Sequence, residues 1–321
     1  MKNKVIGIEI SLKHTTYAAI DVRGNILMSE GFSTTDYPNM NDFISVLCER
    51  VVTMMMNNDL LESVRSVGIS VKSGNFLTGC IENAVNLPWK GVIPLAAMLR
   101  DRLGLAVALG STTQVRGLSE HVFGAAHGMK NFIVVTLGHG MGTSLFSNGQ
   151  IHLGIDGFAG EMGHSCLVHN GWQCGCGKKG CVEAYVAEKG VIRTATELLA
   201  ESSEPSLMRQ ADAITPELVT ECCEKGDALA IETYRRVGYM LGLGIANYAS
   251  IINPEAVIFT GGISKAGNFL FDPALESFNS HVFHNMEGKV PFIVSTLEET
   301  ERDLLGASVL AWDVEEYSLF K

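Results

Sequence analysis

Short apolar segments separated by polar turns run along the whole chain, and their spacing alternates between the two-residue period of strands and the longer period of helices. Segments rich in Val and Ile predict strands over residues 5–10, 16–22, 26–32, 64–71, 106–109, 132–137, 143–147 and 257–259. Apolar positions that recur every three or four residues predict helices over 40–57, 95–103, 114–127, most of 180–250, and 304–314. Strands that alternate with helices predict an α/β protein.

Both halves of the chain begin with a similar order of elements. Predicted strands joined by short turns open the first half, and residues 132–137 start a second series of strand, glycine loop, strand and the turn Asn148-Gly149. The similarity lies in the order of elements and not in residue identity. With 321 residues and 46% hydrophobic content, the chain is long for one core and suits two lobes.

Charge and hydropathy limit the partners to expect. The formal net charge is −11 and Lys and Arg form no block, so nucleic acid is not an expected partner. The uncharged stretch Val237 to Asn253 is shorter than the ~20 apolar residues of a membrane span, and its small residues favour a buried helix. The apolar run at the N-terminus is interrupted by Glu9 and does not predict a signal peptide. We therefore expect a cytoplasmic protein without membrane contact.

The strongest chemical signal is a cysteine cluster. Cys174, Cys176 and Cys181 alternate with glycines, and His164 lies upstream. Thiolates and an imidazole are ligands that zinc prefers, and four of them close a tetrahedral structural site without an open position. His169 is a rival for the fourth ligand, and three unrelated thiols are the alternative without a metal. The remaining cysteines predict small core residues in a reducing compartment, and they are Cys48, Cys80, Cys166, Cys222 and Cys223.

Glycines follow two of the buried strands. Gly138, Gly140 and Gly142 form a loop whose consecutive N–H groups can bind an anion, although plain hairpins contain glycines too. A strand and not a helix follows this loop, which argues against a Rossmann dinucleotide-binding loop. Gly261 and Gly262 allow a flat ligand to approach the backbone, and a simple strand-to-helix turn is the equal alternative.

Together these residues resemble the ROK family (repressor, open reading frame, kinase), whose members are sugar kinases and sugar-responsive repressors. The resemblance covers nearly the whole chain and implies a two-lobed actin-like ATPase (ribonuclease H-like) fold. The matching motifs are Asn86-Leu87-Pro88, Gly160-Glu161-x-Gly163-His164, Cys174-x-Cys176-Gly177-x-x-Gly180-Cys181-x-Glu183, Asn253-Pro254-x-x-Val257-Ile258 with Gly261-Gly262, and Leu305-Gly306-Ala307.

The resemblance also implies an activity and a set of site residues. The activity is transfer of the ATP γ-phosphoryl group to a hexose hydroxyl with Mg²⁺, by a homodimer that holds a structural zinc ion. The implied sugar-binding residues are Ser111, Glu161, His164 and Glu183. The implied nucleotide- and phosphate-binding residues are Glu9, Gly138, Gly140, Gly142, Gly261 and Gly262. For Glu161 and Glu183 the alternative role is to orient the zinc ligands. The lobes are predicted as residues 1–118 with the C-terminal helix 304–321, and residues 119–303.

The sequence departs from the family at the chemistry. The first phosphate loop, D-x-G-G-T-[KN] in the family, is Glu9-Ile10-Ser11-Leu12-Lys13-His14 here, and the G-x-P-G element is Val71-Lys72-Ser73-Gly74 without its proline. Thr112 stands where the family has the aspartate that accepts the proton of the sugar hydroxyl, and His139 replaces the threonine of the second phosphate loop. A threonine hydroxyl is not a general base near neutral pH, and losing such a base costs ~10²–10⁴ in rate.

Two hypotheses follow from these departures. In the first, which we favour, the chain is a hexose kinase with impaired catalysis, because phosphoryl transfer depends heavily on positioning and charge stabilisation. In the second, it is a non-catalytic sugar or nucleotide sensor, or a structural partner of a true kinase. A DNA-binding repressor would need an N-terminal winged helix, and none precedes the first predicted strand.

Overall fold

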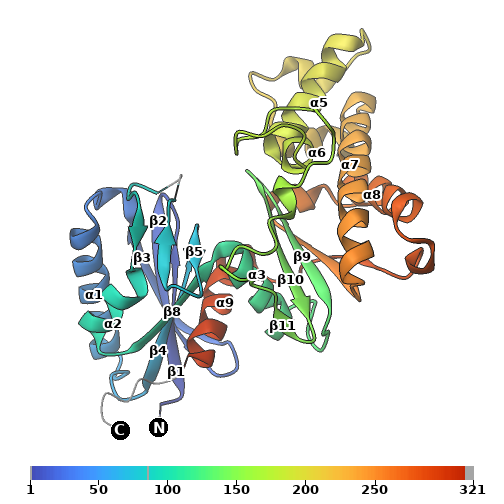
Figure 1. Ribbon diagram of the computed structural model, residues 1–321. Helices are drawn as coiled ribbons and strands as arrows, with labels where there is room; N and C mark the ends of the chain where they lie inside the picture. Colours follow the sequence, from blue (N-terminus) through green and yellow to red (C-terminus); the bar gives the residue numbers. More distant parts are fainter. Residues whose placement is uncertain (1, 85–86, 315–321) are drawn as a thin grey trace. The chain divides into compact units, whose positions relative to one another are not determined.

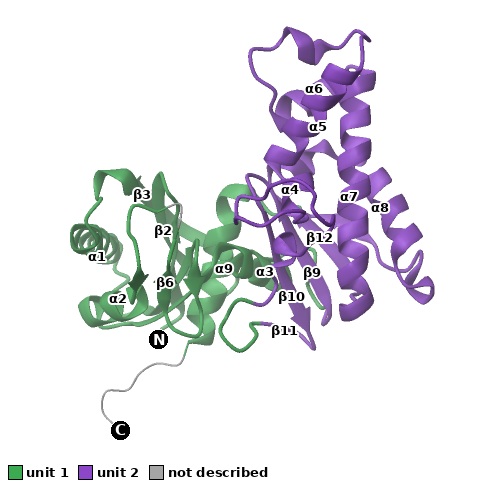
Figure 2. Ribbon diagram, turned by 45° about the horizontal axis from the view of Figure 1, so that its top comes forward, with its two compact units in different colours: residues 1–128, 153–158, 296–321 green, residues 129–152, 159–295 purple. Residues whose placement is uncertain are grey.

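The computed structural model describes residues 2–84 and 87–314 and divides into two compact units, shown in green and purple in Figure 2. Unit 1 comprises Met1–Gly128, Leu153–Phe158 and Thr296–Lys321, and unit 2 comprises Met129–His152 and Ala159–Ser295. The boundary predicted from the sequence, at 118/119, lies ten residues before the boundary between Gly128 and Met129. Asn86 of the Asn86-Leu87-Pro88 motif and the end of the predicted 304–321 segment lie outside the described residues.

Unit 1 is built on a five-stranded sheet of order β3-β2-β1-β4-β8 (Figure 1). β1 pairs antiparallel with β2 and β2 with β3, whereas β4 and β8 continue the sheet parallel to β1. The strands are β1 (Lys4–Ile10), β2 (His14–Asp21), β3 (Ile26–Ser33), β4 (Val64–Val71) and β8 (Ala106–Ser111), with a smaller sheet of β5 (Gly74–Asn75), β6 (Cys80–Glu82) and β7 (Val92–Ile93). The helices are η1 (Thr34–Asp36), α1 (Met40–Asn57), α2 (Leu95–Leu103), α3 (Thr112–Val122) and α9 (Glu299–Asp313).

Different helices cover the two faces of this sheet. On one face, buried Ile6 and Ile8 of β1 share a core cluster with Phe43 of α1. On the other face, α9 lies so close that a Cβ added at Gly68 would collide with the carbonyl oxygen of Ala307. Side chains alternate along a strand, so every second residue of β1 and β4 faces α9.

Unit 2 repeats the pairing pattern of unit 1. Its sheet has the order β11-β10-β9-β12-β13, with β10 antiparallel to β9 and β11, and β12 parallel to β9 and β13. The strands are β9 (Phe132–Leu137), β10 (Met141–Ser147), β11 (Gln150–Ile151), β12 (Ala256–Thr260) and β13 (Phe292–Val294). The turn Asn148-Gly149 has φ of 54° and 78°, as expected for a tight hairpin. The predicted internal repeat is confirmed.

A long helix forms the centre of unit 2's helical layer. α7 (Ala228–Ile252) lies along α8 (Asn268–His281) in Figure 1, and a Cβ added at Gly242 would collide with the carbonyl oxygen of Ala274. The remaining helices are η2 (Met162–His164), α4 (Glu183–Val186), α5 (Glu188–Glu201), η3 (Leu207–Gln210), α6 (Pro216–Glu224), η4 (Gly262–Ala266) and η5 (His284–Met286). The prediction that the glycines near 237–253 serve close packing is confirmed.

None of the helices in the described part of the chain combines the length and the apolar character that a membrane crossing requires.

Three sequence predictions need correction. α9 begins at Glu299 and not at 304, because its first turn is polar and shows no apolar period. α3 ends at Val122 and not near 127, because the Glu120 side chain accepts a hydrogen bond from the N–H of Ala125 and a turn replaces the helix. Cys166 was expected in the core but is exposed, because it lies on the cysteine loop.

We predict that Gly306→Ala destabilises unit 1. A Cβ at this position would collide with the carbonyl oxygen of Val115, where α9 crosses α3. Overpacking at such a contact costs about 1–3 kcal/mol in the free energy of unfolding. Chemical denaturation measures this loss, and Glu301→Ala, an exposed position on the same helix, should stay within about 0.5 kcal/mol of wild type.

Candidate functional site

Four potential metal ligands meet in unit 2. The ligand atoms of His164, Cys174, Cys176 and Cys181 all lie within 4.8 Å of one another. Cys176 Sγ is 3.7 Å from Cys181 Sγ, and Cys174 Sγ is 3.8 Å from His164 Nδ1. A tetrahedron with metal–sulfur bonds of about 2.3 Å has edges of about 3.8 Å. The donor set and its spacing therefore fit a zinc ion, and among the described residues His169 does not belong to the group.

Glycines shape the loop that carries the three thiols. Gly177 and Gly180 have φ of 89° and 79°, which side chains rarely adopt, and a Cβ at Gly180 would also collide with the carbonyl oxygen of Val168. The N–H of Cys174 donates to the carbonyl oxygen of Lys178 at 2.8 Å and closes the turn. Backbone contacts within the segment that precedes α4 thus hold the loop in shape.

His164 reaches the cluster from a segment that is attached to β10. The Thr143 hydroxyl donates to the carbonyl oxygen of Gly160, and it accepts from the N–H of Met162 at 3.3 Å. While His164 Nδ1 faces Cys174, its Nε2 lies 3.9 Å from Glu161 Oε2. The Glu161 side chain is otherwise well exposed, at 60%. It can therefore either orient the imidazole or meet a ligand from solvent.

Glu183 connects the cysteine loop to the glycine loop. It is the first residue of α4, and its Oε2 accepts from the N–H of Met141 at 2.9 Å. Its Oε1 lies 3.5 Å from Cys174 Sγ. A Cβ at Gly140 would sit 2.7 Å from this carboxylate, so a glycine is needed there for the approach. One carboxylate thus positions a potential metal ligand and the loop between β9 and β10.

The glycine loop is a tight hairpin and not a left-handed turn. None of residues 138–142, all of which the structure describes, has positive φ. The N–H of Gly138 donates to the carbonyl oxygen of Gly140, and the N–H of Glu188 donates to that of Gly138. His139 Nδ1 lies 3.0 Å from Glu188 Oε2 with its ring largely exposed. The N-terminus of α5 therefore anchors the loop.

The two glycines after β12 differ in backbone conformation and in the space around them. Gly261 has φ of 91°, and a Cβ there would collide with the carbonyl oxygen of Leu137, so the fold itself requires a glycine. A Cβ at Gly262 would meet only Glu217 Oε1, at 3.9 Å. Open space at Gly262 suits the approach of a flat ligand, whereas the turn alone explains Gly261.

The first loop of unit 1 satisfies its own polar groups. In the turn between β1 and β2, the N–H of Ser11 donates to the carbonyl oxygen of His14 at 3.0 Å. The Ser11 hydroxyl accepts from the N–H of His14 at 3.2 Å. Leu12 is 45% exposed at the tip. These two backbone N–H groups are already bonded and a leucine side chain occupies the tip, so neither N–H group is free to bind an anion.

Ser111 and Thr112 lie where β8 passes into α3. The Ser111 hydroxyl accepts from the N–H of Gln114 at 3.3 Å, and the Gln114 side chain accepts in turn from the N–H of Ser111, which forms a capping box. Gln114 Nε2 also donates to the carbonyl oxygen of Gly157 at 2.9 Å. Ser111 is thus an N-cap, and Thr112 is the first helical residue at the carboxyl end of the sheet.

Charged side chains join α3 to α9 behind this position. Arg116 binds Asp303 through two hydrogen bonds of 2.8 Å, and Arg302 Nε lies 3.3 Å from the buried Glu120. Glu9 of β1 is close to the first pair. Burial raises the pKa of Glu9 to about 7, with Asp303 acting in the same direction and Arg116 against it. The sequence pattern gave no signal for this group, because its members are far apart in the chain.

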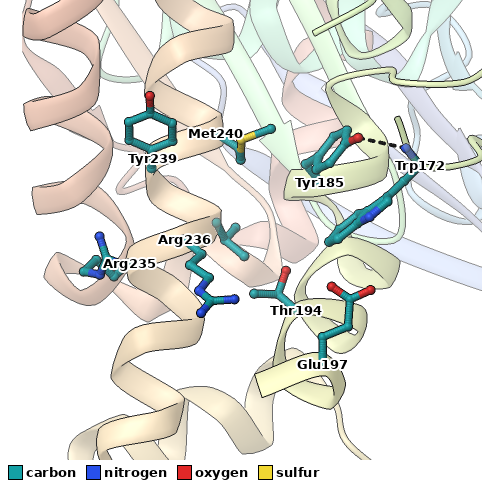
Figure 3. A pocket seen from close by; sticks show the side chains of 9 residues that line it. Trp172, Tyr185, Thr194, Glu197, Arg235, Arg236, Tyr239 and Met240 are labelled. Atoms are coloured by element: carbon teal, nitrogen blue, oxygen red, sulfur yellow. Dashed lines mark hydrogen bonds between the residues drawn. The ribbon is translucent and has the colours of Figure 1, made fainter. Parts of the chain in front are cut away.

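A separate cavity of about 430 Å³ lies in unit 2 (Figure 3). The Trp172 ring stacks on Tyr185 with centroids 4.5 Å apart, and the guanidinium of Arg193 lies 4.2 Å from the same ring. The Tyr185 hydroxyl accepts from the N–H of Trp172 at 2.8 Å. The residues that line the cavity are Trp172, Tyr185, Thr194, Glu197, Arg235, Arg236, Val237, Tyr239 and Met240. The site residues predicted from the sequence are not among them.

Comparison with known proteins gives a consistent result. The ROK family model matches residues 5–314. A glucokinase of Halalkalibacterium halodurans is 34% identical over 238 residues, which cover 72% of each chain. The solved structure of a ROK family glucokinase from Streptomyces griseus in complex with glucose and AMPPNP has a TM-score of 0.78 and 26% identity, covering 97% of this chain and all of that one.

Repressors match as well. The xylose repressor of Bacillus subtilis is 22% identical over 311 residues, which cover 95% of this chain and 76% of the repressor. The residues that the family model matches include both five-stranded sheets and the segments Gly160–His164 and Cys174–Glu183. The chain belongs to the ROK family and is similar over nearly its whole length to the family's glucokinases.

Proposed function

We propose that the protein is a glucokinase-like sugar kinase that transfers the γ-phosphoryl group of ATP to a hexose hydroxyl at a reduced rate. The observation that carries this proposal is the double contact of Glu183, which joins the group of four potential zinc ligands to the glycine loop. The glucokinase of Streptomyces griseus, solved with glucose and AMPPNP, supports a hexose and ATP as the ligands. The homodimer that the family resemblance implies stays a prediction.

This proposal assigns sugar, phosphate and adenine binding to different residues. Glu161, His164 and Glu183 bind sugar hydroxyls or hold the loop that does so, and Ser111 contributes from the start of α3. The loop at Gly138, Gly140 and Gly142 receives phosphate, and Gly262 borders the adenine. Mg²⁺ would supply charge neutralisation between the phosphates. The poor fit of the Ser11–His14 turn to phosphate supports reduced catalysis.

Zinc is the metal that this donor set supports. Three thiols and one imidazole with tetrahedral edges leave no open coordination position, so the ion would be structural. Burial raises the pKa of the Cys174 thiol to about 12 when no cation is present. The ion would hold the sugar-facing segment Gly160–His164 against the cysteine loop.

We predict that Cys176→Ser lowers the zinc content from about one ion per chain to well below half, because a closed site loses one of its four ligands. Elemental analysis after dialysis measures the content, and thermal unfolding measures the accompanying loss of stability. Cys166→Ser is the matched control, since Cys166 lies on the same loop, is exposed and is not in the ligand group. Equal zinc in both variants would remove the proposed site.

We predict that Thr112→Asp raises kcat for hexose phosphorylation by ~10²–10⁴, because it restores a carboxylate at the family's proton-accepting position. A coupled assay with Mg-ATP over a panel of hexoses measures this change. Thr113→Asp places the same charge one residue further along α3 and should not reproduce the gain. Turnover in the wild type as fast as in Thr112→Asp would contradict impaired catalysis.

A sugar or nucleotide sensor is the second candidate. It is favoured by the self-satisfied turn at Ser11–His14, which leaves the phosphate side weakened while Glu161 and Glu183 keep their places. We predict that hexose stabilises the protein in thermal shift by about 2.7 kcal/mol at 100 times Kd. A sensor shows this stabilisation without turnover in any variant, and a purely structural protein shows neither.

A further inference from the structure

A column of polar positions runs across the unit 1 sheet on its α9 side. Glu9 of β1 is in register with Ser70 of β4, and Ser70 with Gly110 of β8. Gly7, two residues before Glu9, faces the α9 backbone at Leu304, so Glu9 shares that face. Adjacent strands lie about 4.8 Å apart, so Glu9 lies two strand spacings, about 10 Å, from Gly110, which is two residues before Thr112.

Arg116 places Glu9 near the first turn of α3. Thr112 and Arg116 lie four residues apart and thus on one face of the helix. The Arg116 guanidinium binds the Asp303 carboxylate of α9 through two hydrogen bonds of 2.8 Å. That guanidinium is also the charge that acts on Glu9. The Glu9 carboxylate and the Thr112 position therefore converge on the same end of unit 1.

The surroundings keep the Glu9 carboxylate available. Arg116 is engaged in two hydrogen bonds by Asp303, so its charge is largely compensated, and Glu299 is a further acidic neighbour of Arg116. In the described part of the chain, Glu9 has charged neighbours but no side-chain hydrogen bond. The Ser70 hydroxyl beside it is fully buried and has no partner among the described residues.

We propose that Glu9 is the proton acceptor that replaces the missing aspartate at position 112, with Ser70, whose buried hydroxyl lies on the neighbouring strand in register with Glu9, as a positioning residue. This inference rests on the proposed function. The O–H bond of the hexose hydroxyl breaks and its proton passes to the Glu9 carboxylate. The hydroxyl oxygen bonds to the γ-phosphorus of ATP, the bond to the bridging oxygen breaks, and ADP leaves.

The decisive experiment measures kcat for hexose phosphorylation against pH in the wild type and in Glu9→Gln. A base must be ionised to act, so the wild-type kcat should rise with pH through an apparent pKa of about 7 and then level off. Glu9→Gln should lower the already reduced wild-type kcat further and abolish this rise, with KM little changed, because the proton is taken in the transition state. Glu301→Gln, an exposed carboxylate on α9, is the matched control and should behave as wild type.

Three further variants distinguish a loss of the base from a loss of the fold. Adding Thr112→Asp to Glu9→Gln should restore turnover. The kcat of this double variant should then rise with pH through an apparent pKa near 4, the ordinary value of a carboxylate. Glu9→Asp keeps the carboxylate but shortens the side chain by one methylene, which moves the charge away from the sugar hydroxyl. This variant should retain the pH dependence and have a lower kcat. Ser70→Ala should change the pH at which kcat rises, and the protein should remain folded.

The outcomes separate the two proposals. If Glu9→Gln turns over like wild type, or if the wild type is inactive while Thr112→Asp is active, Glu9 is not the base although the protein remains sugar-kinase-like. If neither protein turns over and no hexose stabilises either, the proposed function itself is wrong, and the inference about Glu9 is lost with it.

Discussion

In unit 2, the relative positions of the cysteine loop and the glycine loop depend on two contacts of one carboxylate, that of Glu183. Glu183 must accept a hydrogen bond from the Met141 N–H and also lie against Cys174. A Cβ at residue 140 would lie 2.7 Å from Glu183 Oε2, the atom that accepts from Met141, so a side chain there would displace this contact. A shift of the cysteine loop therefore moves the glycine loop, and a phosphate at the glycine loop would affect the ligand group through the same carboxylate. Through this carboxylate, a metal ion at the four potential ligands would influence the glycine loop without offering an open coordination position.

In unit 1, the polar side chains at the corresponding places form hydrogen bonds within the protein. The Ser11 hydroxyl bonds to its own turn, and the Ser111 hydroxyl caps α3. Two ion pairs of opposite direction, Arg116–Asp303 and Arg302–Glu120, hold α3 against α9. Buried charges are tolerated only with their partners, and removing one partner typically costs 3–5 kcal/mol. The start of α3 is thus fixed firmly, although it lacks the usual acidic group.

The sequence predicted the fold well wherever a single element determined its own pattern. α1 and β9 occupy the predicted residues, because their apolar periods are uninterrupted. The thiols and His164 were also predictable, since the loop that gathers them is local and closed by its own glycines. The link between Glu183 and Met141, the support of Gly160 by Thr143, and the pair Arg116–Asp303 were not predictable. Each of these joins residues whose contact exists only after the chain has folded, and no periodic pattern records it.

Polar groups that the fold leaves without a partner are the most informative part of unit 1. A buried hydroxyl or carboxylate that makes no hydrogen bond raises the free energy of the folded state, typically by about 1–3 kcal/mol, so folding alone does not favour it. Around the start of α3 most such groups are satisfied, whereas Glu9 lacks a side-chain hydrogen bond and the Ser70 hydroxyl next to it is buried without one. A fold that had lost all use for this end of the sheet would gain stability by replacing both with apolar residues. Of the two, Ser70 is fully buried and Glu9 is partly exposed, so Glu9 is the member of this pair that a ligand at the start of α3 would meet.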